Sequence, residues 1–123
     1  MDSFSIFFRG KPSDDEICTA VLATGAGAYC RAPGEIVASR KTAHVWLYSS
    51  SVADLPSRED WPIPKHDVGR ILDLAVSREE ESSALAAEIA HQLAVELGGV
   101  ISWDGHEHWR GMYQKAYQHD SSG

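Results

Sequence analysis

The sequence predicts an α+β fold in which two helices cover one face of an antiparallel or mixed sheet. Three observations predict it: strand-like alternation recurs along the chain, two segments have helical periodicity, and each of those segments begins with a capping signal. The chain has 123 residues, of which 43% are hydrophobic, as in a single folded domain. We expect this domain to span residues 1–118 and residues 119–123 to form a disordered tail.

The N-terminal part predicts a strand and then a helix. In residues 3–9, Phe4, Ile6 and Phe8 occupy alternate positions, so they share one face of a strand. Ser13 and Glu16 have the spacing of a capping box, in which each residue bonds the backbone N–H of the other. We therefore expect the first helix to run over residues 14–24.

Short strands are expected in the middle of the chain, near residues 28–31, 35–39 and 42–48. The following residues, 49–68, contain three prolines and should form a long irregular connection. The strand at 42–48 has the clearest alternation, with Ala43, Val45 and Leu47 on one face and His44, Trp46 and Tyr48 on the other.

The C-terminal half predicts a further strand over residues 69–78 and then the longer helix. Ser77 and Glu80 form a second capping-box pattern, and Gly98-Gly99 ends the helix before a strand at 100–103. The apolar stripe of this helix consists of Leu85, Ala86, Ile89, Ala90, Leu93 and Leu97. A short C-terminal helix follows, with a one-sided stripe of Trp109, Met112, Tyr113 and Tyr117.

We summarise the predicted order as β-α-β-β-β-α-β with a short C-terminal helix, a two-layer sandwich of ferredoxin-like type. The helices should cover the face that carries Val45 and Leu74. The opposite face carries Trp46 and other aromatic side chains, and such a face seldom remains bare. We expect the aromatic stripe of the C-terminal helix to cover it; pairing of two such faces in a homodimer is the alternative.

Charge limits the classes of partner. The chain carries 18 acidic and 11 basic residues, a net charge of −7, so its surface repels nucleic-acid backbones. The N-terminus lacks a signal-peptide pattern, and no apolar stretch approaches the length of a membrane span. We therefore expect a cytoplasmic protein that binds neither nucleic acid nor membrane. Cys18 and Cys30 lack metal-ligand spacing and are expected to be small core residues.

Catalytic motifs are not found in the sequence. It contains no G-x-S-x-G, and the glycines at 25–27 end a helix rather than begin one, unlike a nucleotide-binding loop. We therefore expect a protein that is not an enzyme and has no cofactor. The alternative is a small enzyme or ligand-binding domain that uses the sheet face around His44, Trp46 and Tyr48.

The segment WDGHEHWRG at 103–111 raises metal binding as a further alternative. His106 and His108 would share a face of a strand and could reach one metal ion, but they would diverge on a helix. Asp104-Gly105 is a turn signal, and no sequence spacing nominates a third ligand. We therefore interpret the segment as a turn before the C-terminal helix and expect no metal site.

A small acidic α+β domain whose second helix runs into ELGGVISWDG resembles the bacterial immunity proteins encoded beside contact-dependent or type VI toxins. The resemblance covers chiefly residues 70–105 and carries no diagnostic motif. It implies that the chain binds and neutralises a cognate toxin domain by occluding its active site. An acidic inhibitor suits a basic toxin domain by charge complementarity. The acidic and aromatic loop residues that we expect to contact this partner are Glu59, Asp60, Trp61, Asp104, His106, Glu107, His108 and Trp109.

Overall fold

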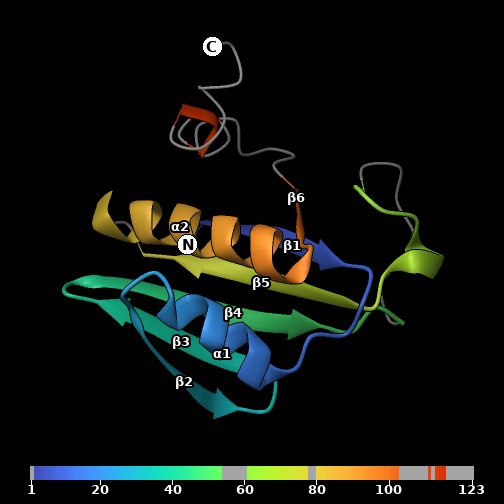
Figure 1. The fold of residues 1–123 in the computed structure, drawn as a ribbon, viewed down its shortest axis with the longest axis horizontal. Helices are drawn as coiled ribbons and strands as arrows, with labels where there is room; N and C mark the ends of the chain where they lie inside the picture. The colour runs from blue at the N-terminus through green and yellow to red at the C-terminus, as the bar shows by residue number, and fades with distance from the viewer. Residues whose placement is uncertain (1, 54–60, 78–79, 103–110, 112, 116–123) are drawn as a thin grey trace.

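The structure, a computed structural model, describes residues 2–53, 61–77, 80–102, 111 and 113–115 (Figure 1). In this part of the chain, six strands form one antiparallel sheet, and two α-helices lie on the same face of it (Figure 1). The elements are β1 (Asp2–Phe8), α1 (Asp14–Leu22), β2 (Gly27–Ala32), β3 (Glu35–Arg40), β4 (Ala43–Ser50), the 3₁₀ turn η1 (Lys65–Asp67), β5 (Arg70–Val76), α2 (Glu80–Leu97) and β6 (Val100–Ser102).

The strands lie in the order β2-β3-β4-β5-β1-β6. The first strand therefore lies inside the sheet, between β5 and β6, and the β5-α2-β6 segment forms a split β-α-β unit around it. The α+β class with helices on one face is confirmed. Four strands, β2 to β5, lie between the two helices and match the four predicted ranges, although the summarised order wrote only three strands there.

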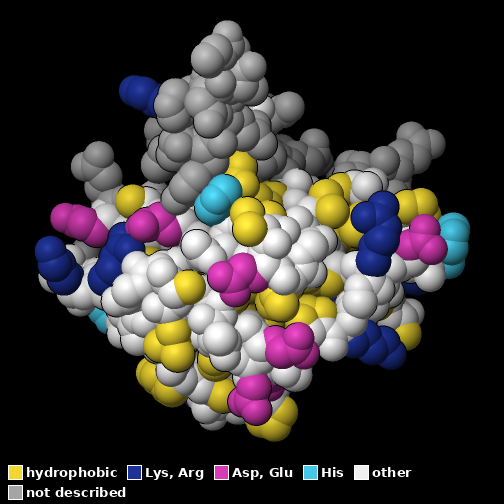
Figure 2. All heavy atoms as spheres, in the orientation of Figure 1, with side chains coloured by type: hydrophobic (Ala, Val, Ile, Leu, Met, Phe, Trp, Pro, Cys, Tyr) yellow, Lys and Arg dark blue, Asp and Glu magenta, His cyan; other side chains and the backbone are white. Residues whose placement is uncertain are grey.

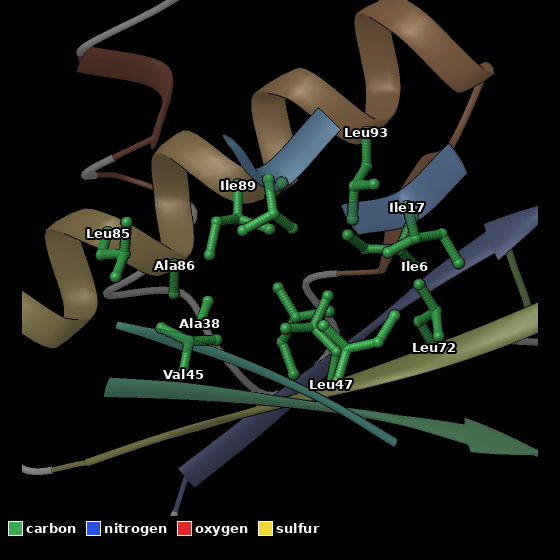
Figure 3. Packing of buried hydrophobic residues seen from close by; sticks show 14 of the residues in the cluster. Ile6, Ile17, Ala38, Val45, Leu47, Leu72, Leu85, Ala86, Ile89 and Leu93 are labelled. Carbon is green, nitrogen blue, oxygen red and sulfur yellow. The ribbon is translucent and has the colours of Figure 1, made fainter. Parts of the chain in front are cut away.

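The core lies between the helices and the sheet (Figure 3). The alternation predicted for β4 is confirmed: Val45 and Leu47 point into this core, and Leu47 lies opposite Leu74 of β5. From α2, Leu85 and Ile89 extend toward the sheet, and both are fully buried (Figure 3). Each such side chain contributes roughly 1.5–3 kcal/mol through its removal from water, so the two layers are stabilised mainly by this contact.

The N-terminus of α1 has the predicted capping box. The backbone N–H of Glu16 donates to Ser13 Oγ at 3.1 Å, and the N–H of Ser13 donates to Glu16 Oε1 at 3.2 Å. The helix ends at Leu22, two residues earlier than the predicted end at 24, and Gly25 follows with φ +84°. That left-handed conformation favours glycine, so the chain turns there into β2.

A buried serine joins α2 to the start of β4. Ser82 is fully buried, and its Oγ accepts a 3.0 Å hydrogen bond from the backbone N–H of His44. The hydroxyl of Ser77 donates to the same oxygen. Residues 78–79 lie outside the described part of the chain, so the second predicted capping box, Ser77 with Glu80, stays a prediction.

The two cysteines have different environments, and both are free thiols. Cys18 on α1 is half-buried and packs against the core, as predicted. Cys30 was predicted to be a core residue, and this is wrong, because its side chain is exposed. The physical reason is the position of β2, which is the outermost strand of the sheet.

Candidate functional site

The face of the sheet opposite the helices carries a row of aromatic and small apolar side chains. Tyr29, Val37, Trp46 and Ala75 lie opposite one another on β2, β3, β4 and β5. Because directly opposed residues of neighbouring strands share one face, each of these side chains is in contact range of the next one in the row. Val37 is nearly buried although neither α1 nor α2 lies on this face, since Tyr29 and Trp46 flank it.

The next row along the strands alternates acidic and aromatic side chains. Glu35, Tyr48 and Asp73 lie opposite one another on β3, β4 and β5, so the Tyr48 ring stands between two carboxylates. Ser5 Oγ donates to Asp73 Oδ1 at 2.6 Å, and Ser50 Oγ donates to Asp73 Oδ2. Asp73 is therefore held in one orientation by both of its oxygens.

His44 is a third aromatic side chain on the same face of β4, next to the turn between β3 and β4. Its ring stacks on that of Trp46 with the centroids 6.0 Å apart and the planes 20° apart. Its Nδ1 lies 3.1 Å from the carbonyl oxygen of Thr42, which restrains the ring. We call the set His44, Trp46, Tyr48, Glu35 and Asp73 the aromatic–acidic surface.

The other end of this face is covered by residues 61–68. Ile63 and Val68 from this segment pack on Phe7 and Ile71 of the sheet and form a second, smaller core. The ring of Trp61 lies against that of Phe7, with centroids 5.3 Å apart and planes at 57°. Trp61, which the sequence proposed for partner contact, is thus half-buried at the edge of this small core.

The remaining residues predicted to contact a partner lie outside the described part of the chain, so their contact with a partner stays a prediction. They are Glu59, Asp60, Asp104, His106, Glu107, His108 and Trp109.

We expected the aromatic stripe of the C-terminal helix to cover the sheet face opposite α1 and α2, which we call the open face. For Tyr113, the one residue of this stripe that the structure describes, the expectation is wrong. This residue is buried, and its hydroxyl lies 3.3 Å from His91 Nδ1 on α2, in the helical layer. The two rings are 6.0 Å apart between centroids, and burial raises the pKa of the Tyr113 phenol. His91 itself is half-buried. Tyr113 therefore packs against α2 and not against the opposite face of the sheet.

A hollow of about 480 Å³ lies at the turn between β3 and β4. Its Arg40 side chain is already bonded to the protein, because it donates to the carbonyl oxygen of Thr24 at 2.8 Å and pairs with Glu88. Within the described ranges, no group of three or more His, Cys, Asp or Glu side chains has the arrangement of a metal site. The residues that line the hollow are Arg40, Lys41, Thr42, Ala43, Glu81 and Ala84.

No protein-family model matches this sequence, and comparison with curated proteins and with solved structures gives no match. Function must therefore be argued from the residues of the chain.

Among the described helices, none combines the length and the apolar character that crossing a membrane requires. In the orientation of Figure 1, acidic side chains are spread over the face in view, whereas most of the Lys and Arg side chains lie toward its left and right ends (Figure 2).

The sequence interpretation named the aromatic members of the open face but missed Glu35 and Asp73. A signal for Asp73 was present, since it is a charged residue between Leu72 and Leu74 in the middle of a mainly apolar strand. In a strand with one covered face, a central carboxylate marks the uncovered face. Glu35 follows a Pro-Gly turn and could be placed beside Asp73 only once the strand order was known.

Proposed function

We propose that this chain is an immunity-type inhibitor, which binds a basic toxin domain and occludes its active site through the aromatic–acidic surface. The observation that carries the proposal is the arrangement of Tyr48 between Glu35 and Asp73, with Trp46 in the adjacent row. Tyr and Trp are the residues that most often dominate the energy of protein interfaces. Their flat rings supply contact area at a low cost in conformational entropy.

The chemistry of this surface suits cationic side chains. An Arg or Lys of the partner could lie over the Tyr48 or Trp46 ring and pair with a neighbouring carboxylate, combining cation–π attraction with a charged hydrogen bond. The two serine hydroxyls on Asp73 hold its carboxylate in place before binding, which lowers the ordering cost. The net charge of −7 would also speed encounter with a basic partner.

The ferredoxin-like interpretation of the fold is part of this proposal. It takes β4, β5, β1 and β6 with the two helices as the basic unit, and β2 and β3 as a hairpin added at one edge. The split β-α-β arrangement of β5, α2 and β6 around β1 supports it. We also propose a cytoplasmic location, where an inhibitor of this kind would meet a toxin that enters or is made in the cell.

The test begins with capture of a partner by the tagged chain from a lysate of its native cells, followed by mass spectrometry. We expect one stoichiometric, basic protein. Its catalytic activity is then measured with increasing amounts of the purified chain. We expect inhibition at one-to-one stoichiometry. A partner whose activity is unchanged by saturating amounts of the chain would contradict the inhibitory role.

Two sets of variants locate the interface. The first set, Trp46→Ala with Tyr48→Ala and, separately, Asp73→Asn, changes the aromatic–acidic surface. The second set combines alanine at Asp60, Trp61, Glu107 and Trp109, the loop residues that the sequence proposed. We expect the first set to weaken binding at least tenfold, a loss of about 1.4 kcal/mol. Val95→Ala, an exposed apolar residue on α2, is the matched control.

The same purified sample distinguishes the alternative function. A small-molecule or metal analysis that finds a stoichiometric ligand, with no protein partner captured, would favour a ligand-binding domain or enzyme. That outcome together with loss of the ligand in Trp46→Ala would assign the ligand to the open face.

A further inference from the structure

Asp73 lies between two serine hydroxyls that come from different strands. Ser5 of β1 is directly opposite Asp73 and donates to its Oδ1 at 2.6 Å. On the other side of β5, Tyr48 of β4 is opposite Asp73, and Ser50, two residues farther along β4, donates to Oδ2. The two hydroxyls thus come from the two strands that flank β5. They fix the orientation of the carboxylate as well as its position.

The two hydroxyls leave a defined set of acceptor positions on Asp73. An ionised carboxylate has about four lone-pair positions, which are divided equally between its oxygens. A serine hydroxyl takes one position on each oxygen, so each oxygen keeps another for a ligand. Two acceptors on one rigid group match the two parallel N–H donors of a guanidinium, whereas an ammonium group binds as a point charge. The remaining acceptors of Asp73 therefore favour arginine over lysine.

Neither carboxylate of the aromatic–acidic surface has a cationic partner among the described residues. Within that part of the chain, no Lys, Arg or His side chain forms an ion pair with Glu35 or Asp73. Asp14 differs from them, because its carboxylate is paired with Arg70. Both Glu35 and Asp73 are half-buried, and salt screens a half-buried charge less than a fully exposed one. A cation supplied by a partner therefore gains more here than on an exposed acidic side chain.

The ring of Tyr48 provides a flat surface beside the Asp73 carboxylate. Tyr48 is 37% exposed and stands between Glu35 and Asp73 in one row of the sheet. Directly opposed residues have Cβ atoms about 4.5–5.5 Å apart, so a cation over the ring has a carboxylate within reach on each side. A guanidinium is planar and weakly hydrated, and it stacks on aromatic rings more often than an ammonium does. It can stack on Tyr48 while its edge donates to Asp73.

We propose that the aromatic–acidic surface selects an arginine side chain of the partner, which stacks on Tyr48 and donates two parallel hydrogen bonds to Asp73. Ser5 and Ser50 are positioning residues. They act through Asp73, because they hold its carboxylate still and leave one acceptor position on each oxygen. The partner is the basic protein of the proposed function, on which this inference rests. The preference for arginine is nevertheless a property of this chain alone, so it can be measured without that partner.

The isolated arginine site is examined by NMR titration of the isotope-labelled full chain with two capped tripeptides, Gly-Arg-Gly and Gly-Lys-Gly, at constant ionic strength. We expect amide shifts centred on Tyr48 and Asp73. The dissociation constant of the arginine peptide should be about tenfold smaller than that of the lysine peptide. Asp73→Asn should abolish this preference. Equal dissociation constants for the two peptides, or shifts centred elsewhere on the chain, would overturn the proposal.

The ratio of the two dissociation constants separates a positioning role of the serines from a merely structural one. Ser5→Ala combined with Ser50→Ala should bring the ratio close to one, because a carboxylate that rotates freely offers no fixed pair of acceptors. Ser50→Thr keeps a hydroxyl and should keep the preference. Ser39→Ala, at a serine on the same face of β3 and two rows away, is the matched control and should leave the ratio unchanged. A double alanine variant that is folded by circular dichroism and keeps the full ratio would overturn the positioning role.

The peptide titration and the inhibition assay fail independently of each other. A captured partner that the chain inhibits, together with equal binding of the two peptides, overturns the arginine site and leaves the inhibitory role. A clear arginine preference, together with a partner that the chain does not inhibit, supports the arginine site and contradicts the inhibitory role. Where both hold, replacing the exposed arginines of the partner by lysine, one at a time, should reveal one that couples to Asp73→Asn in a double-mutant cycle. Coupling to none of them would overturn the proposal.

Discussion

The guanidinium of Arg70, the first residue of β5, donates a 2.6 Å hydrogen bond to the carboxylate of Asp14, the first residue of α1. Arg70 also donates to the carbonyl oxygen of Pro12 and to Ser49 Oγ at the end of β4, each at 2.6 Å. Because Asp14 bonds the N–H of Gly34 as well, one ion pair connects the first helix, two central strands and the β2–β3 turn. First-turn position alone would explain an acidic residue here, but the structure gives this residue a second role.

Replacement of Asp14 by alanine should lower the free energy of unfolding by about 1.5–3 kcal/mol, since charged hydrogen bonds to Arg70 and Gly34 are lost. Asp15→Ala is the matched control. The Asp15 carboxylate is exposed, and it lies in the same first turn of α1, where the helix dipole also favours a negative charge. Its cost should be about 0.3–1 kcal/mol. Urea denaturation of both variants checks the difference. Equal losses would mean that the dipole, and not the ion pair, is what Asp14 contributes.

The same ion pair predicts a dependence of stability on pH. The hydrogen bonds from Arg70 and Gly34 hold the pKa of Asp14 below its ordinary value of 3.8. The stabilisation is therefore fully present above about pH 3.8 and is lost as the pH falls through the lower pKa of the folded state. The stability difference between the unmodified chain and Asp14→Asn should be constant near neutral pH and shrink below pH 3.8. A difference that stays constant into strong acid would contradict this.

Local sequence signals were enough to predict most elements. The capping box at Ser13 and Glu16 fixed the start of α1, and the alternation around Val45 identified the buried face of β4. These signals act between residues that are close in sequence, through hydrogen bonds and side-chain periodicity. They require no knowledge of which strands become neighbours.

The errors arose where the strand order or a distant contact decides the environment. Cys30 has the pattern of a buried strand residue and becomes exposed because β2 is outermost. Tyr113 belongs to an apolar stripe that had to be covered, but the sequence could not choose between the open sheet face and His91 on α2. The acidic members of the proposed binding surface, Glu35 and Asp73, come together only through the pairing of β3, β4 and β5.

Ile63 tests whether residues 61–68 are a structural cover of the sheet. Its side chain is buried in the second core with Phe7 and Ile71, so Ile63→Ala should cost about 2–5 kcal/mol through lost burial and a residual cavity. Val95→Ala, at an exposed site on α2, should change stability by no more than about 0.5 kcal/mol. Thermal unfolding followed by circular dichroism compares the two. An unchanged melting temperature for Ile63→Ala would show that this segment contributes little to the fold and that the open face is accessible over Phe7.

Gly69, just before β5, tests the close approach of two backbone segments. Its N–H donates to the carbonyl oxygen of Phe8 at 2.7 Å. A Cβ atom at this position would contact the carbonyl oxygen of Gly10 and lie 2.7 Å from the Gly10 carbonyl carbon and 2.8 Å from the oxygen of Arg9. These are backbone atoms, which cannot move aside by a rotamer change, so Gly69→Ala must displace the end of β1 from the start of β5. We expect a loss of about 1–3 kcal/mol or more.

Gly10 is the matched control for this substitution, because a Cβ atom there would meet nothing within 4 Å. Gly10→Ala should be neutral or stabilise the chain by up to about 1 kcal/mol, since alanine restricts the unfolded chain without straining the folded one. Urea denaturation of both variants, with the same probe, gives the comparison. If Gly69→Ala were as stable as Gly10→Ala, the two segments would have room to separate. The hydrogen bond from Gly69 to Phe8 would then not be what sets the register at this end of the sheet.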